Sequence, residues 1–466
     1  MFQRLKSIPW LPLILGLTLL RLITAASMDL VPDEAYYWLW SQHPAFGYFD
    51  HPPMVAWWIT ASTTLFGHSP LAVRLPFLLS FAGLLWFSWD TAKSLFHEAV
   101  ARRVVLWLNA CLLLSVGSII ATPDPPSVLM WSAGLWALAR LHTSNKPTWW
   151  LVFGLFAGLG VEAKYTNLFL GLGVAAWMLL DKPARRWLLT PWPYLGGLTA
   201  LCAVAPNLLW NAHHDWISVT KQFGRIDRGH FTVKFLIEFL LSQPLLLNPL
   251  ICVFTILGAK TALRATESPL CLLVALPMPL LAYLLIHVFH DRIQGNWPAP
   301  VFPGLVILAA AAAQTVQNPL LTRLRWLAAP FGVGLSALIL ATMALSTKIP
   351  NLGAPWQGWT NLTHNSHKPD WIATTDYDTH GELAYHATGA YPLFAMAERQ
   401  RYPWQGAPPT GKALIVVAPN HTPDLARCFS DLTEAGTLSR TPKPGKKTTF
   451  RLFTGTLKSP DCDLGK

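Results

Sequence analysis

The sequence predicts a polytopic α-helical membrane protein with a small α/β domain at its C-terminal end. Of its 466 residues, 52% are hydrophobic and only 13% are charged, whereas soluble domains carry about 25% charged residues. The charge is also unevenly distributed, because residues 346–466 hold 23 charged residues in 121 positions and the 345 residues upstream hold 36. This break separates a membrane domain from a more polar tail and excludes a soluble globular enzyme.

Apolar runs that match a bilayer in length recur along residues 1–346, which we assign to one transmembrane domain. A membrane helix needs about 20 apolar residues, and about eleven spans are expected, at residues 8–27, 70–92, 101–121, 126–141, 149–163, 166–181, 188–209, 235–258, 269–289, 298–316 and 326–346. Lys and Arg cluster in gaps that can alternate on one side, and the positive-inside rule places that side and the N-terminus in the cytoplasm. The formal net charge of +11 therefore reflects topology rather than nucleic-acid binding, and an odd number of spans places the tail outside.

The tail is expected to form an extracytoplasmic α/β domain over residues 370–466, after a linker over residues 347–369 that is rich in Pro, Gly, Asn and His. Alternating apolar segments predict strands, and two further patterns predict helices between them. The strands are expected at 371–375, 392–397, 413–418 and 449–453, and the helices at 380–386 and 423–434. If the tail lies in an oxidising compartment, Cys428 and Cys462 are positioned in sequence to form a disulfide.

Acidic residues are scarce in the membrane domain, and most of them fall on the face opposite to the cytoplasm. The densest group lies in the first outer loop, residues 28–68, which holds Asp33 and Glu34 and then Asp50 and His51. Asp33 also fits a helix cap, and the aromatic residues that follow it also fit an interfacial belt. Carboxylates gathered on an outer face indicate binding of a cation, acid-base chemistry or metal chemistry at that face.

A recognisable motif occupies this loop. The string PDEAYYWLWSQHPAFGYFDHPPMVAWW, residues 32–58, closely resembles the first outer loop of bacterial GT-C glycosyltransferases, in the group of protein O-mannosyltransferases and aminoarabinose-transferase (ArnT-like) enzymes. The resemblance covers essentially residues 10–320 and extends weakly to TDY at 375–377. Further stretches match in the same order, namely VRLP at 73–76, ATPDP at 121–125, AKYT at 163–166, WN at 210–211 and NWPAP at 296–300.

The resemblance implies a GT-C fold and a multi-pass protein of the bacterial inner membrane. It also implies that the donor is a sugar linked to a polyprenyl phosphate, and that the acceptor is an outward-facing lipid, glycan or protein. The reaction is expected at the outer boundary between membrane and water. Inversion at the anomeric carbon is expected from the resemblance and from the logic of a single displacement.

Attack on an anomeric carbon whose leaving group is a lipid phosphate needs a base beside the acceptor hydroxyl. We assign Asp33 as this base, and Glu34 as its orienting partner or as a second carboxylate. The transition state resembles an oxocarbenium ion and gains from nearby negative charge. Asp124, between prolines in the second outer loop, is therefore assigned to stabilise this state or to bind the acceptor, although it also fits an ordinary turn.

Cationic side chains are expected to neutralise the departing phosphate. Arg292, in a short outer loop, and Lys164, near the outer end of a span, are the favoured residues. The competing interpretations are a salt bridge of Arg292 with Asp291 and an internal pair of Lys164 with Glu162. Further substrate-binding roles are assigned to Arg74, which also fits a helix-end anchor, and to Tyr165, Asn296 and Trp297.

One departure from the family pattern concerns the segment FDHPP. In ArnT-like relatives this segment commonly has an acid and then a lysine before the prolines, whereas this chain has Asp50 and His51. The position therefore lacks a permanent positive charge. Three alternative roles remain open for His51. It could hydrogen-bond the phosphate, hold a divalent metal ion together with Asp50, or brace the turn.

A protein of another class would share many of these features. A transporter or flippase of a lipid-linked sugar also has many spans and intramembrane charges. Alternating access normally places the polar site near the bilayer midplane, whereas here the acids gather at one face. The enzyme is therefore the favoured interpretation.

Overall fold

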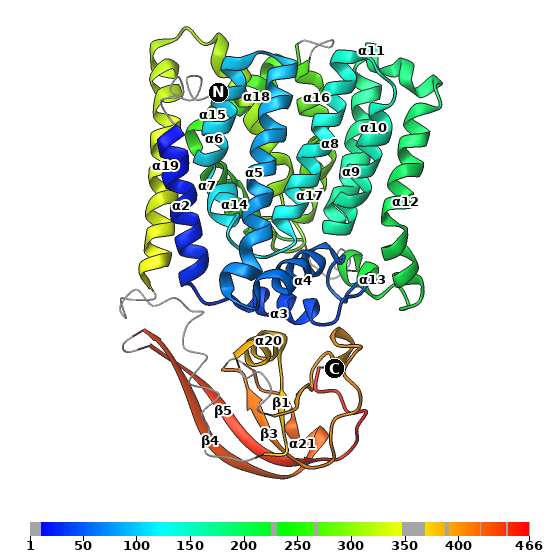
Figure 1. Ribbon diagram of the computed structural model, residues 1–466, viewed down its shortest axis with the longest axis vertical. Helices are drawn as coiled ribbons and strands as arrows, with labels where there is room; N and C mark the ends of the chain where they lie inside the picture. The colour runs from blue at the N-terminus through cyan, green and yellow to red at the C-terminus, as the bar shows by residue number, and fades with distance from the viewer. Residues whose placement is uncertain are drawn as a thin grey trace.

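The computed structural model describes residues 11–224, 231–264, 269–346, 369–386, 391–419, 421–443 and 446–465. Figure 1 shows two stacked parts, a bundle of helices and, below it, a curved sheet with α20 between the two. The linker expected at 347–369 lies outside the described residues except for its last position.

The helical part combines long helices that run along one common direction with short helices at its lower end (Figure 1). Short 3₁₀ turns occur at η1 (Tyr165–Asn167), η2 (Arg186–Leu189) and η3 (Ala299–Val301). The α-helices are α2 (Leu11–Ser27), α3 (Pro32–Ser41), α4 (Met54–Phe66), α5 (Pro70–Leu95), α6 (Glu98–Ala110), α7 (Leu112–Gly117), α8 (Asp124–Ser144), α9 (Trp149–Ala163), α10 (Leu168–Leu180), α11 (Lys182–Arg185), α12 (Trp192–Ala212), α13 (Ile217–Phe223), α14 (Lys234–Leu247), α15 (Pro249–Ala262), α16 (Pro269–Ala275), α17 (Met278–His287), α18 (Phe302–Thr315) and α19 (Pro319–Ser346).

Several expected spans are divided into shorter helices. Within the described ranges, four helices are long and apolar enough to cross a membrane, at Pro70–Leu95, Trp192–Ala212, Pro269–His287 and Pro319–Leu345. The pairs α2–α3 and α14–α15 pass the same test together, with bends of 77° and 100°, and the number is up to six if each bent pair is counted as one span. The expected number of about eleven is not confirmed, because breaks interrupt other runs; extended backbone at Cys111, for example, separates α6 from α7.

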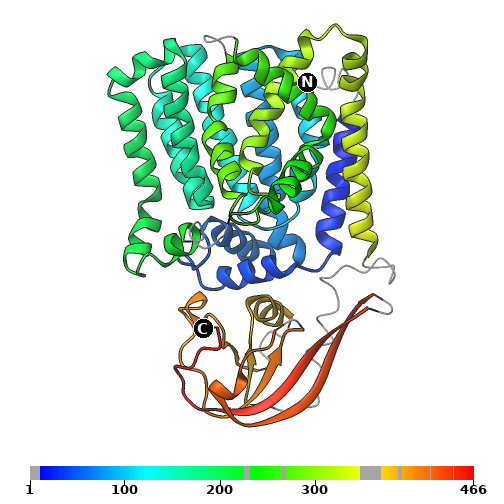
Figure 2. The ribbon, with the colours of Figure 1, turned by 180° about the vertical axis from the view of Figure 1, so that it is seen from behind.

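Helix packing brings distant parts of the chain together. In both Figure 1 and Figure 2, α2 and α19 run side by side at one edge, and Thr24 Oγ1 donates to the Leu340 carbonyl at 3.1 Å. Toward the other edge, α9 packs against α12 so closely that a Cβ on Gly196 would lie 2.6 Å from the Trp150 carbonyl oxygen. Such close contacts of small residues stabilise helix pairs in membranes, and Gly158 makes a similar contact with Ala200 nearer the end of α9 that precedes Lys164.

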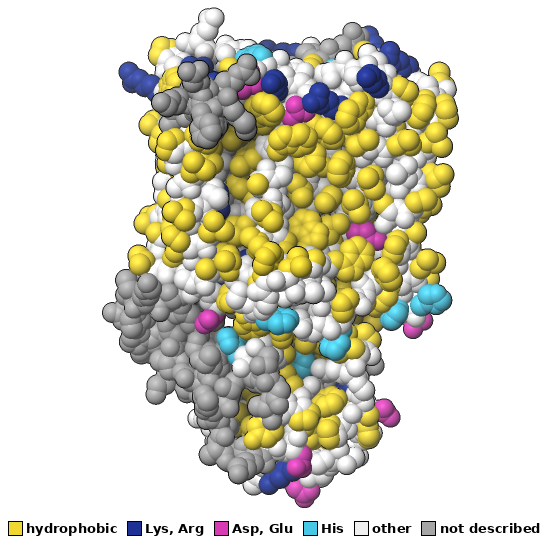
Figure 3. Space-filling model, viewed as in Figure 1, with side chains coloured by type: hydrophobic (Ala, Val, Ile, Leu, Met, Phe, Trp, Pro, Cys, Tyr) yellow, Lys and Arg dark blue, Asp and Glu magenta, His cyan; other side chains and the backbone are white. Residues whose placement is uncertain are grey.

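The surface of the helical part agrees with a membrane location. Figure 3 shows a broad hydrophobic band across the face in view, with Lys and Arg gathered at the end that α11 occupies. His and acidic side chains are seen near the opposite end, where the C-terminal domain begins. An apolar belt between two polar rims is the surface that a bilayer requires. This surface and the C-terminal sheet confirm the predicted fold class, a helical membrane protein with a small C-terminal α/β domain.

A five-stranded sheet with the order β2-β1-β3-β5-β4 forms the C-terminal domain. β1 (Trp371–Thr374) pairs in parallel with β2 (Leu393–Ala395) and β3 (Lys412–Val417). β5 (Lys446–Leu457) pairs antiparallel with β3 and with β4 (Phe429–Lys443). α20 (Tyr377–His386) connects β1 to β2. The four strands and the first of the two helices that the sequence predicts are therefore present.

The second helix expected in this domain, at 423–434, is wrong. Only α21 (Leu425–Cys428) is helical, and Phe429 begins the long strand β4. Pairing with β5 satisfies backbone groups that a helix would satisfy locally. Asp431 (φ 53°) and Gly436 (φ 97°) adopt left-handed backbone near shifts in the β4–β5 register. Both residues therefore lie at irregularities in a strand.

The C-terminal domain packs directly on α3, the helix that opens the first outer loop. α20 contacts α3 along its length, and Tyr385 Oη donates to the His68 carbonyl at 2.8 Å. A second bridge joins Lys221, on α13, to Glu398 at 3.2 Å. The two parts of the molecule therefore meet around the loop that carries the acidic motif.

Gly381, inside α20, sets how closely the two parts approach. A Cβ at this position would lie 2.8 Å from the Tyr36 backbone nitrogen and 3.0 Å from its Cα. Alanine is normally favoured over glycine in a helix by about 0.5–1 kcal/mol, but overpacking costs about 1–3 kcal/mol. We therefore expect Gly381→Ala to lower the thermal unfolding midpoint of the purified protein.

Gly171 offers the matched control, because it lies inside α10 and a Cβ there would have no neighbour within 4 Å. Gly171→Ala is expected to leave the midpoint unchanged or to raise it. Equal midpoints for Gly381→Ala and the wild type would mean that the contact between α20 and α3 is looser than described.

Candidate active site

A cavity lies where α3, the following loop, α8, α9 and the C-terminal domain meet. It encloses about 1370 Å³ of empty space, part of which is open to solvent. Eight of the eleven residues that the sequence predicts for the site line it, namely Asp33, Asp50, His51, Asp124, Lys164, Tyr165, Asn296 and Trp297. The other three, Glu34, Arg74 and Arg292, do not.

Asp33 is the accessible carboxylate of this cavity. It follows Pro32 in the first turn of α3, and its side chain retains access to solvent. Tyr377, the first residue of α20, donates from Oη to Asp33 Oδ1 at 3.4 Å. Burial within the cavity raises the pKa of the Asp33 carboxyl, and nearby Asp50 and Asp124 raise it further, whereas the Tyr377 hydrogen bond opposes the shift. A carboxylate that is accessible and has a raised pKa suits a general base.

Asp378 lies beside this carboxylate, on the domain that covers the cavity. Burial is the main cause that raises the pKa of Asp378 from 3.8 to about 6, and the charges of Asp376 and Asp33 add to it. The folded state therefore binds the proton more tightly than the unfolded state does. The corresponding stability, about 3 kcal/mol at most, is present below about pH 4 and is lost as the pH rises through 6.

We expect Asp378→Asn to raise the thermal unfolding midpoint at about pH 7.5 and to leave it unchanged at about pH 4. The measurement compares both proteins in the same detergent at the two pH values. A midpoint at pH 7.5 that equals that of the wild type would show that the domain contact does not desolvate this carboxyl.

Asp124, Lys164 and Asn296 form a hydrogen-bonded unit on one wall of the cavity. Lys164 Nζ contacts Asp124 Oδ1 at 2.7 Å, and Asn296 Nδ2 donates to Asp124 Oδ2 at 2.6 Å. Asp124 begins α8, where the helix dipole favours a negative charge. Lys164 has extended backbone directly after α9, so it leaves the helix axis and reaches Asp124. The alternative pair of Lys164 with Glu162 is absent from the ion pairs that the described residues form.

Asp50 and His51 lie on another wall, and Asp50 is already engaged. Its carboxylate accepts from Tyr36 Oη at 2.8 Å and forms an ion pair with Arg401. Burial raises the pKa of the Asp50 carboxyl, and the Arg401 guanidinium and the Tyr36 hydrogen bond counteract part of that shift.

The hypothesis of a metal ion at Asp50 and His51 gains no support from this arrangement. In the described part of the chain, no group of three or more His, Cys, Asp or Glu residues is placed to hold a metal ion. Asp50 instead joins a basic residue of the C-terminal domain, so its nearest cation is a guanidinium.

Glu34 and Arg74 form an internal clamp. Both side chains are 0% exposed, and Arg74 Nη2 contacts Glu34 Oε2 at 2.5 Å. Glu34 also accepts from the backbone nitrogens of Val31 at 2.9 Å and Ala121 at 2.8 Å. Neither side chain lines the cavity, and the roles expected for Glu34, as orienting partner or second carboxylate, and for Arg74, in substrate binding, stay predictions. The clamp fixes the start of α3, and with it Asp33.

Arg292 also lies away from the cavity. Its side chain is 65% exposed and forms an ion pair with Glu238 of α14. The role expected for Arg292 at the donor phosphate stays a prediction. A solvent-exposed ion pair of this kind adds little to the stability of the fold.

Arg401 is the basic residue of the cavity that the sequence analysis missed. It ends the 3₁₀ helix η6 (Arg399–Arg401), its side chain is 8% exposed, and its guanidinium lies 4.9 Å from the Tyr377 ring centroid. No motif marks it, and more than 300 residues separate it from Asp50. Arg401 supplies the permanent positive charge that the FDHPP segment lacks.

A second, mostly apolar cavity of about 710 Å³ adjoins the first. The two share Thr122, Asp124 and Asn296. Phe81, Leu84 and other apolar side chains of α5, α7 and α8 line the remainder. A hydrocarbon chain therefore has an apolar surface available directly beside the polar site.

Fold and site together define a multi-pass helical membrane protein with a carboxylate-lined cavity between its helices and its C-terminal domain. A family model described as dolichyl-phosphate-mannose-protein mannosyltransferase matches residues 50–210. The lipid A galacturonosyltransferase RgtD of Rhizobium johnstonii is 28% identical over 309 residues, which are 64% of this chain and 64% of that protein. The match thus spans slightly less than two thirds of this curated relative.

Solved structures agree with this assignment. ArnT from Cupriavidus metallidurans bound to undecaprenyl phosphate has a TM-score of 0.71 at 16% identity, with 98% of each chain covered. Its apo form has a TM-score of 0.70 at 16% identity, with 96% of this chain and 98% of that chain covered. The resemblance predicted from the sequence is confirmed: the chain has the GT-C fold of the ArnT-like group.

Proposed function

We propose that the chain is an integral-membrane glycosyltransferase that moves a monosaccharide from a polyprenyl-phosphate-linked sugar to an outward-facing acceptor. The observation that carries this proposal is the cavity itself, in which an accessible carboxylate, Asp33, shares one space with Lys164 and Arg401. A base and cations around one space are what displacement of a phosphate at an anomeric carbon requires. The solved ArnT with undecaprenyl phosphate supports the same class of donor.

In the proposed reaction, Asp33 accepts the proton of the acceptor hydroxyl as its oxygen attacks the anomeric carbon. The bond between that carbon and the phosphate oxygen breaks, and the polyprenyl phosphate leaves with the electron pair. Attack from the side opposite to the leaving group inverts the anomeric configuration. Asp124 stabilises the positive charge that develops on the sugar, with its carboxylate oriented by Lys164 and Asn296.

Lys164 and Arg401 are proposed to hold the departing phosphate. Each now contacts a carboxylate, Asp124 or Asp50 respectively, so each has a fixed position and a charge that phosphate oxygens can share. His51, Tyr165 and Trp297 complete the lining around the sugar. The adjoining apolar cavity is proposed to take the first isoprene units of the donor.

For the acceptor we propose a lipid. The curated relative is named for action on lipid A, and an apolar cavity adjoins the polar one. Protein and glycan acceptors are the competing outcomes of the assay below.

We infer that the C-terminal domain faces the periplasm or the cell exterior, and that the basic rim at α11 faces the cytoplasm of a bacterial inner membrane. The positive-inside rule supports this orientation. The disulfide between Cys428 and Cys462 supports it independently.

The proposal is tested by reconstituting the purified protein in vesicles with a labelled polyprenyl-phosphate sugar and, separately, a lipid, a glycan or a peptide acceptor. Transfer of label to the lipid is the expected result. Movement of the donor across the bilayer without transfer would favour the flippase instead, and transfer to the peptide or glycan alone would overturn the lipid assignment.

A further inference from the structure

The turn that carries Arg401 is held by the C-terminal end of the chain. Glu398 precedes η6 with left-handed backbone (φ 47°), a conformation that non-glycine residues rarely adopt. Its side chain accepts from Arg401 Nε at 2.6 Å and from Lys221 Nζ at 3.2 Å. Such a turn persists only where its surroundings stabilise it.

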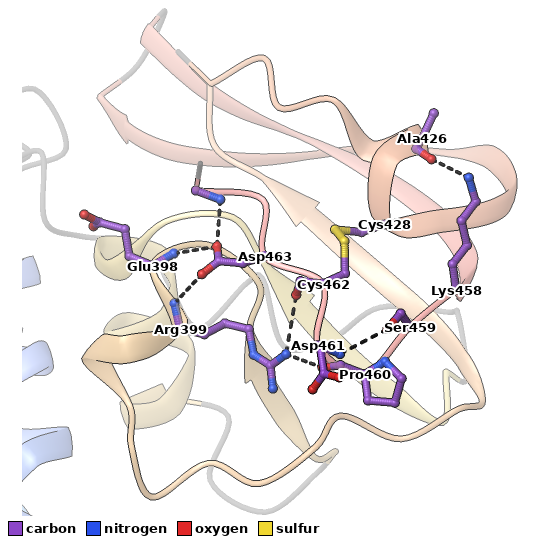
Figure 4. Close-up of a disulfide and its surroundings, with 11 residues drawn as sticks. Glu398, Arg399, Ala426, Cys428, Lys458, Ser459, Pro460, Asp461, Cys462 and Asp463 are labelled. Carbon is purple, nitrogen blue, oxygen red and sulfur yellow. Dashed lines mark hydrogen bonds between the residues drawn. A yellow bond between two sulfur atoms is a disulfide. The ribbon is translucent and has the colours of Figure 1, made fainter. Parts of the chain in front are cut away.

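Asp463 supplies that stabilisation. Its Oδ1 accepts from the Glu398 backbone nitrogen at 3.1 Å, and its Oδ2 accepts from the Arg399 backbone nitrogen at 3.2 Å. Figure 4 shows the carboxylate directed at both groups. One side chain therefore satisfies two backbone donors at the start of the turn.

The segment that carries Asp463 is itself fastened to the sheet domain. Cys462 forms a disulfide with Cys428, which is buried at the end of α21 (Figure 4). Lys458 Nζ donates to the Ala426 carbonyl at 2.6 Å, and the Leu464 backbone nitrogen donates to the Met396 carbonyl at 2.5 Å. These contacts hold residues 458–464 beside the turn.

We propose that Asp463, fastened by the Cys428–Cys462 disulfide, is a positioning residue that fixes the Arg401 guanidinium in the cavity. This inference rests on the proposed function, because it assigns Arg401 to the donor phosphate. Asp463 does not line the cavity, so it acts only through the turn. Without it, Glu398 and Arg401 leave the positions in which they contact Lys221 and Asp50.

The test measures donor kinetics for Asp463→Ala and, as the matched control, for Asp461→Ala two residues earlier. A displacement of about 1 Å at a group that holds a substrate costs up to about 100-fold, so we expect kcat/KM for the donor to fall by about 10- to 100-fold in Asp463→Ala. Asp461 is exposed, and its variant is expected to match the wild type. Asp463→Asn, which keeps one acceptor oxygen, is expected to lose less.

Combining Asp463→Ala with Arg401→Ala shows whether the loss of activity comes from misplacement of Arg401 or from a general loss of stability. If Asp463 acts through Arg401, Asp463→Ala lowers activity in the wild-type background but has little further effect in Arg401→Ala. Additive losses in the double variant would overturn the proposal, as would unchanged donor kinetics in Asp463→Ala. If the Asp463→Ala chain does not fold, the same cycle is run with Asp463→Asn.

The disulfide is tested with the variant Cys428→Ser/Cys462→Ser in the same assay. Its donor kinetics are expected to resemble those of Asp463→Ala, and full activity would remove the disulfide from the proposal. Absence of transfer by the wild type contradicts the proposed function itself, whereas transfer that is insensitive to Asp463 contradicts only the positioning role.

Discussion

Replacing Asp33 by Asn is expected to lower kcat for sugar transfer by about 10²- to 10⁴-fold, because an amide cannot accept the acceptor's proton and general-base catalysis contributes about that much. The substitution keeps the size of the side chain and its hydrogen-bonding oxygen. Binding of the donor should therefore change little, and the loss should appear in kcat rather than in KM. The measurement is steady-state transfer from the labelled donor in vesicles.

Asp215→Asn is the matched control for this experiment. Asp215 is exposed on the same side of the membrane domain, and its left-handed backbone (φ 53°) is one that asparagine also adopts. Its variant is expected to transfer sugar at the wild-type rate. Equal kcat for Asp33→Asn and the wild type would remove Asp33 from the mechanism and direct attention to Asp124.

The second large effect is expected from Arg74→Ala, which leaves the buried Glu34 carboxylate without its cation. Removing one partner of a buried ion pair costs about 3–5 kcal/mol. Arg74 also donates to the carbonyls of Ala25, Met28 and Asp29 at 2.6–2.9 Å, and these acceptors lose their partner as well. The midpoint of thermal unfolding in detergent should fall markedly.

Two further variants show whether the buried charge of Glu34 causes the loss of stability expected for Arg74→Ala. Adding Glu34→Gln to Arg74→Ala removes the buried charge and is expected to restore part of the stability. Arg292→Ala removes an exposed arginine paired with Glu238 and should have no measurable effect. A midpoint for Arg74→Ala close to that of Arg292→Ala would mean that the clamp is not buried as described.

Most of the site was predictable because its residues lie in short motifs. Asp33, Asp50 and His51 belong to one loop, and Asp124 and Lys164 each follow an apolar run at the outer face. Residue type and membrane topology therefore place these side chains on one surface. The roles of individual residues stay predictions until the variants are measured.

Other features of the site and of the fold depend on packing. Glu34 follows Asp33 directly, but the helical turn directs the two side chains differently, so that one reaches the cavity and the other is buried beneath α3. Arg292 was assigned from its loop, and only the fold shows that Glu238 lies next to it. The helix expected at 423–434 failed because pairing with β5 overrides local preference.

The uneven charge and the apolar runs by themselves determined that this is a multi-pass membrane protein, because a bilayer imposes length and polarity on every segment that crosses it. The first outer loop, which carries Asp33 and Glu34, determined which face carries the acids. Only the tertiary structure decided that the C-terminal domain belongs to the site, since Arg401 reaches Asp50 through the docking of α20 on α3. Contacts between residues hundreds of positions apart depend on packing, which local sequence patterns do not encode.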